Sequence, residues 1–241
     1  MTQITKLYDA IVEDLIQSGV GSRYKADANE PDPRYKSYGV RAAGKKQVIK
    51  THRAAIRKLA FDDKLALAQR LIESEVGEQQ SVALHILEPH ADYFTPQRFD
   101  ELDRLVRYLH GWSKIDSYTG SLLRDVWFQH PDAMRELVQS WNQDDDLWLR
   151  RASVVLFTRK VAKSGRFTDF ALSLGENLLF DNEDLVQKGV GWMLKDLMRA
   201  DKPRIVAYVK QLRQRNVSST ITLYAVRDLK GAERAAVLAR T

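Results

Sequence analysis

Apolar side chains recur at helical spacing along almost the whole chain. The two clearest stripes are Ile4, Leu7, Tyr8, Ile11, Val12, Leu15 and Ile16, and Phe99, Leu102, Leu105, Val106 and Leu109. Because residues at i, i+3, i+4 and i+7 share one face of an α-helix, each stripe predicts an amphipathic helix. No convincing alternation of apolar and polar residues predicts a strand. The pattern therefore predicts an all-α fold.

Short stretches with proline or glycine separate the predicted helices. They read EPH at 88–90, TPQ at 95–97, HPD at 130–132, KSG at 163–165 and DKP at 201–203. Since these residues end or restart helices, the segments between them are roughly 10–20 residues long. Residues 19–44 are poorly periodic. We expect a loop there, or a loop with one short helix.

The helical segments also repeat. DDLWLRRASVVLF at 145–157 and EDLVQKGVGWMLK at 183–195 lie 38 residues apart, and Leu147 matches Leu185. A weaker match is EQQSVALHIL at 78–87. A period near 38 with two helices per unit is the size of a HEAT-type repeat, whose helical pairs bury their faces against their neighbours. We predict one domain over residues 1–241, an α-solenoid of about six HEAT-like helical pairs with a concave basic groove.

Composition excludes several classes of protein. The chain has 241 residues, 44% of them hydrophobic, which is enough for a sizeable core. The absence of cysteine excludes disulfides, thiol catalysis and thiolate metal sites, and it fits a reducing cytosol. The N-terminus is helical and acidic, unlike a signal peptide, and the most apolar stretch, ASVVLF, is far too short to span a membrane. We expect a cytoplasmic protein with no membrane partner.

Positive charge gathers in two regions. The net charge is +6; residues 1–140 hold 20 basic and 20 acidic side chains, whereas residues 141–241 hold 18 and 12. Residues 23–53 hold nine Lys or Arg against three acids. Two separate basic regions suit a polyanion such as nucleic acid. A generically basic soluble protein is the alternative interpretation of the same charges.

The usual catalytic and metal-binding motifs are missing. The chain has no G-x-G-x-x-G and no P-loop, and its five histidines do not fall at ligand spacing. The acidic run Asp144, Asp145 and Asp146 is interpreted as the cap of the following helix rather than as a cation site. We therefore expect neither a metal nor an organic cofactor.

Four residues remain as a candidate site. Trp112 and Asp116 share one face of a predicted helix; Arg151 follows Asp116 by 35 residues, and Trp192 follows Arg151 by 41. Each step is about one repeat, so the four side chains could gather on the concave face. The alternative places Trp112 in the core and Asp116 at the surface. The other tryptophans, Trp127, Trp141 and Trp148, are assigned to the core.

Three segments, HGWSKIDS, DLWLRRASVVLF and VQKGVGWMLKDL, resemble the signature segments of the AlkD family of HEAT-like-repeat DNA glycosylases. The resemblance runs from about residue 60 to about residue 200. It implies excision of cationic N3- and N7-alkylpurines from double-stranded DNA without a closed base pocket. A capped solenoid has no need to self-associate, so we expect a monomer. The resemblance also implies catalytic positions at Asp116, Trp112 and Trp192, and a DNA contact at Arg151. Further DNA-binding candidates are Arg150, Lys188, Lys195, Lys114 and Tyr35.

The chain also departs from the family pattern. Ser113 and Lys114 stand where members more often have an acidic or amide residue and a small one, so Lys114 either holds a phosphate or weakens the effect of Asp116. In DPRYKSYGV the spacing is altered, and Tyr38 is an alternative to Tyr35. Two other functions stay open: a DNA-binding relative that no longer cleaves, and a protein-binding HEAT scaffold, although the basic excess favours a polyanion.

Overall fold

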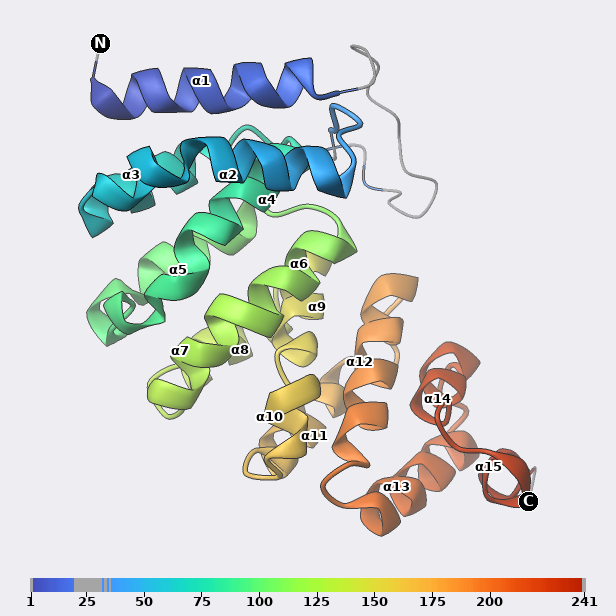
Figure 1. Cartoon of the computed structure of the whole chain (residues 1–241). Helices are drawn as coiled ribbons and strands as arrows, with labels where there is room; N and C mark the ends of the chain where they lie inside the picture. The colour runs from blue at the N-terminus through green and yellow to red at the C-terminus, as the bar shows by residue number, and fades with distance from the viewer. Residues whose placement is uncertain (1, 20–31, 33, 35, 240–241) are drawn as a thin grey trace. The chain divides into compact units, whose positions relative to one another are not determined.

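A computed structural model describes residues 2–19, 32, 34 and 36–239. Within this part of the chain, regular structure is helical apart from one isolated bridge between Lys36 and Val76, so the predicted all-α fold is confirmed (Figure 1). None of the described helices is both long and apolar enough to cross a membrane. The chain forms two compact units, Met1–Pro131 and Asp132–Thr241. Since each unit is described by itself, the single domain and its concave groove stay predictions.

The first unit is built on an N-terminal helix that lies against the next two. Its elements are α1 (Gln3–Gln17), α2 (Ala42–Lys58), α3 (Phe61–Ile72), α4 (Gly77–Leu87), η1 (Glu88–Tyr93), η2 (Pro96–Arg98), α5 (Phe99–Arg107), α6 (Trp112–Tyr118), η3 (Thr119–Leu123) and α7 (Arg124–Gln129). α1 contacts α2 and α3, and α4 contacts α2, α3 and α6. From the first predicted stripe, Leu7, Ile11 and Leu15 are buried. The stripe therefore forms the face that packs on the unit.

The second unit shows the stacking of successive repeats. Its elements are α8 (Arg135–Asn142), α9 (Leu147–Val155), α10 (Arg159–Lys163), α11 (Thr168–Asn177), α12 (Asp184–Leu197), α13 (Lys202–Gln214), α14 (Ser219–Ala225) and α15 (Gly231–Leu238). α9 packs on α12, and α12 packs on α14. These are one helix from each of three successive helical pairs, which is the arrangement of an α-solenoid. The two repeats found in the sequence are α9 and α12.

Most predicted helix ends agree with the structure. α4 ends just before EPH, α5 begins just after TPQ, α7 ends just before HPD and α13 begins within DKP. Asp146 caps α9, as predicted, because its Oδ1 accepts a hydrogen bond of 2.8 Å from Trp148 N. Of the irregular stretch 19–44, residues 42–44 belong to α2, and residues 20–31, 33 and 35 lie outside the described part. The prediction of a short helix there is therefore untested.

Candidate functional site

The helix that carries Trp112 and Asp116 begins abruptly at a glycine. Gly111 has φ 91° and ψ 134°, a backbone conformation that favours glycine over other residues. Its carbonyl accepts hydrogen bonds from Lys114 N at 3.0 Å and Ile115 N at 3.3 Å. Since Ile115 is fully buried, it fixes the rotation of α6 about its axis. The segment HGW thus sets both the start and the orientation of the candidate helix.

The exposed fraction of each tryptophan separates the candidates from the core. Trp127, Trp141 and Trp148 are at most 1% exposed, as predicted, whereas Trp112 is 40% exposed. The alternative that placed Trp112 in the core is therefore wrong. Asp116, one helical turn later, is 6% exposed. A partly exposed aromatic ring and a mostly buried carboxylate thus share one face of α6.

The far end of α6 is held in place by two hydrogen bonds. Tyr118 donates its hydroxyl to the Leu102 carbonyl at 3.0 Å, and Thr119 donates its hydroxyl to the Ile115 carbonyl at 2.8 Å. Burial raises the pKa of Tyr118 well above its ordinary value, so the phenol stays protonated and can donate. α6 then continues into η3, a π-helical turn. Such turns occur frequently at functional sites.

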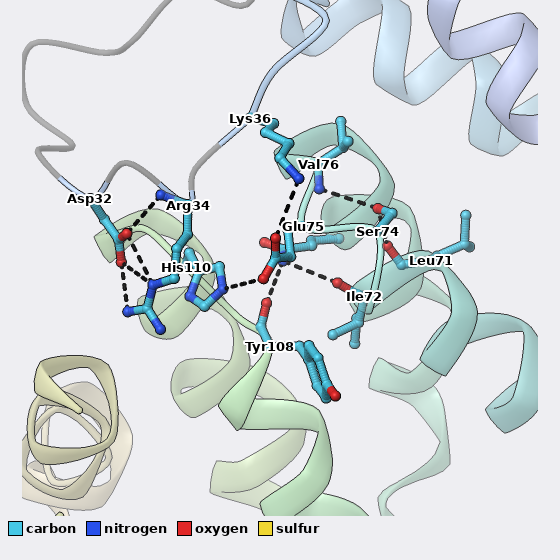
Figure 2. Close-up of polar contacts among 11 residues, drawn as sticks. Asp32, Arg34, Lys36, Leu71, Ile72, Ser74, Glu75, Val76, Tyr108 and His110 are labelled. Carbon is cyan, nitrogen blue, oxygen red and sulfur yellow. Dashed lines mark hydrogen bonds and ion pairs between the residues drawn. The ribbon is translucent and has the colours of Figure 1, made fainter. Parts of the chain in front are cut away.

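The segment before α6 is fastened to the turn between α3 and α4 (Figure 2). His110, buried beside Gly111, donates from Nε2 to Glu75 at 3.3 Å, and Lys36 Nζ lies 3.3 Å from the other carboxylate oxygen. Gln80 donates to the Tyr108 carbonyl at 2.6 Å. These contacts bring together residues that are far apart in the sequence. They position the start of α6 from outside the helix.

Burial and hydrogen bonding together set the protonation of His110 and Glu75. Burial lowers the pKa of His110, as does the charge of Arg34, and together they outweigh the hydrogen bond to Glu75, which raises it. Burial alone would raise the pKa of Glu75, but hydrogen bonds from His110 and Lys36 outweigh it and leave that pKa lowered. The folded protein therefore holds a neutral imidazole against an ionised carboxylate at neutral pH.

We expect His110 to make the protein less stable in mild acid. Unfolded histidine has a pKa of 6.5 and the folded residue a lower one, so the unfolded chain binds the proton first and stability falls as pH drops through 6.5. His110→Gln removes this loss. The test measures the free energy of unfolding of wild type and variant at pH 8 and at pH 5.5. The difference in unfolding free energy between the two proteins should be smaller at pH 5.5. A constant difference would contradict the lowered pKa.

In the second unit, Trp192 is held by a buried carboxylate. Trp192 Nε1 donates to Asp196 Oδ2 at 3.0 Å, and Arg159 N donates to the same oxygen at 2.7 Å. The Arg159 guanidinium lies 4.8 Å from the centroid of the Trp192 ring. Asp196 was missed from the sequence. Its signal was the spacing G-W-x-x-x-D, which occurs both at Gly191 to Asp196 and at Gly111 to Asp116.

The two adjacent arginines of α9 make different contacts. Arg151 is buried and donates to the Leu185 carbonyl at the start of α12. Arg150 pairs with Asp181 at 2.6 Å and donates to the carbonyls of Asp144 and Asp145 at 2.8 Å. These contacts give Arg150 a structural part, joining the turn before α9 to the loop before α12. A DNA contact at Arg150 stays a prediction.

The other predicted DNA contacts differ in exposure. Lys188 is exposed and pairs with Asp184 within α12, whereas Lys195 is half-buried and lies 3.3 Å from Asp196 and 3.5 Å from Asp228. Lys114 is only 6% exposed. Tyr35 lies outside the described residues. The alternative to it, Tyr38, accepts a hydrogen bond from Gln79 at 2.8 Å.

The predicted four-residue site is described in two halves. Trp112 and Asp116 belong to the first unit, and Arg151 and Trp192 to the second, where Arg151 contacts α12 near its start. Their convergence on one face stays a prediction. Within the described ranges, no group of three or more histidine or acidic side chains is placed to hold a metal ion. What each half offers is an aromatic ring near a carboxylate and basic side chains.

Comparison with known proteins identifies the family. No curated protein matches the chain. Among solved structures, a predicted DNA alkylation repair enzyme from Enterococcus faecalis is similar, with a TM-score of 0.70 at 14% identity over 83% of this chain and 91% of that one. At this identity the likeness shows the fold alone. The family model described as DNA alkylation repair enzyme matches residues 24–229. The chain therefore belongs to the family of DNA alkylation repair enzymes.

Proposed function

We propose that this protein is a DNA glycosylase that excises cationic N3- and N7-alkylpurines from double-stranded DNA. The observation that carries the proposal is the pair on α6, where a partly exposed Trp112 lies one turn before a mostly buried Asp116. Membership of a family of DNA alkylation repair enzymes supports alkylated DNA as the class of substrate. We propose that it acts as a cytosolic monomer without a metal or an organic cofactor.

The reaction does not require a general acid. Alkylation at N7 of guanine or N3 of adenine makes the base cationic, so the base leaves with the electrons of the N-glycosidic bond without first being protonated. The sugar then becomes an oxocarbenium-like cation. The Asp116 carboxylate would stabilise that cation and orient the water that adds to it, as carboxylates do in glycoside hydrolysis. Burial of Asp116 strengthens this effect because less water screens the charge.

The two tryptophans would assist through their ring faces. A cation over an indole face is stabilised by about 0.5–2 kcal/mol. The Arg159 guanidinium already lies over one face of the Trp192 ring, 4.8 Å from its centroid, so the sugar would contact the other face. We propose that Trp112 and Trp192 receive the sugar in the same way, with Arg151 near a flanking phosphate.

Substrate choice tests this mechanism. We expect release of 7-methylguanine from duplex DNA to be at least about 100-fold faster than release of hypoxanthine or uracil, because neutral bases need a general acid that the proposal does not include. Single-turnover release from matched duplexes that differ only in the lesion measures the ratio. Comparable excision of the neutral bases would contradict the mechanism.

A further inference from the structure

The helix beside the candidate site is strongly basic. α2 reads AAGKKQVIKTHRAAIRK, with six Lys or Arg and no acidic residue. Lys45 and Lys46, in its second turn, form no ion pair within the described residues. Their charges are therefore not neutralised by an ion pair within the described part of the first unit. The two ammonium groups are thus available to an anion from outside the chain.

A pocket lies where α2, α4 and α6 meet. Its volume is about 360 Å³, and Lys45 and Lys46 line it from α2, while Ser113, Lys114 and Ser117 line it from α6. Among the described lining residues, Glu88 is the one carboxylate, against three lysines. The pocket therefore offers a net positive charge together with hydroxyl donors, as a phosphate group requires.

Lys114 is the most buried of the three lysines that line the pocket. It is 6% exposed, and its ammonium donates to the Ser113 hydroxyl at 3.2 Å. A lysine is rarely buried to this extent, since its charge loses hydration there. An anion in the pocket would add to the contacts that Lys114 already makes, in line with the first of the two roles considered for it.

The geometry of α6 relates this pocket to the candidate site. Ser113 and Ser117 each follow a site residue, Trp112 or Asp116, by one position. One position is about 100° around an α-helix, so the pocket face and the site face of α6 adjoin. A DNA strand that placed a sugar at Asp116 would pass a neighbouring phosphate toward the pocket.

We propose that Lys45, Lys46 and Lys114 hold a backbone phosphate of DNA in this pocket. The inference rests on the proposed function in so far as DNA is the ligand. In it, Lys114 is a positioning residue, which fixes the strand at α6 while Asp116 acts on the sugar. The contact does not depend on the base sequence of the DNA, because the backbone phosphate is the same beside every base.

Binding of undamaged duplex tests the proposal without excision. Lys114→Met should lower the slope of log affinity against log salt by about 0.9, the value for one phosphate contact. The double variant Lys45→Met with Lys46→Met should lower it at least as much, and it changes no buried side chain. Lys50→Met is the matched control, since Lys50 is exposed on α2 and does not line the pocket; its slope should stay closer to that of the wild type.

A duplex with a single neutral methylphosphonate locates the contact. It is placed at successive positions around a single 7-methylguanine, which fixes the register; it should weaken wild-type binding most at one position, and Lys114→Met should be insensitive there. Wild-type slopes and scans in both lysine variants, with unchanged melting temperatures, would overturn the pocket even if alkylpurines are released. Lowered slopes in a protein that releases no alkylpurine would support the pocket and refute the glycosylase.

Discussion

Asp116→Asn is expected to slow release of 7-methylguanine about 100-fold or more, which corresponds to roughly 3 kcal/mol of lost transition-state stabilisation. The amide keeps the volume of the carboxylate but carries no charge, so the developing sugar cation loses its counter-charge. DNA affinity should stay within about threefold of the wild type, because phosphates rather than carboxylates supply it. Single-turnover release and duplex binding, measured on the same preparations, separate the two effects.

Controls are needed because Asp116 is mostly buried. Asp100→Asn changes an exposed carboxylate on α5 of the same unit and should leave release unchanged. Thermal melting shows whether Asp116→Asn is folded. A folded variant with wild-type release would contradict the role of Asp116. If wild type and variant both bind DNA and neither releases base, the protein is a DNA-binding relative without glycosylase activity. A DNA affinity that does not change with salt concentration would favour the protein-binding scaffold.

Local features of the sequence predicted the helix that carries the site. The i, i+4 spacing placed Trp112 and Asp116 on one face, and it needs only the geometry of a single helix. The 38-residue repeat likewise predicted that α9 and α12 stack, since both share one pattern of buried positions. Burial of Trp127 also followed from its apolar surroundings. Each of these rests on neighbours within one helix or one repeat.

Contacts between residues that are far apart in the sequence were not indicated by any local pattern. Glu75 meets His110 across 35 residues, and Arg150 meets Asp181 across 31. A charged side chain in the sequence gives no indication of which partner it will find, so the contacts of Arg150 with an aspartate and two carbonyls were not predicted. The exposure of Trp112 was equally unpredictable, because it depends on which side of α6 the rest of the unit covers.

Gly191→Ala is expected to lower the free energy of unfolding by about 1–3 kcal/mol, as overpacking of a filled core does. A Cβ at Gly191 would lie 2.7 Å from the Tyr224 Cβ and 2.8 Å from the Ile221 carbonyl oxygen, and neither atom can move without shifting α14. The matched control is Gly175→Ala, whose Cβ would meet the flexible end of Met193 at 2.8 Å. Since Met193 can adopt another rotamer and alanine favours helices, that variant should lie within about 1 kcal/mol of the wild type. Equal melting temperatures of the two variants would contradict the close approach of α12 and α14 at Gly191.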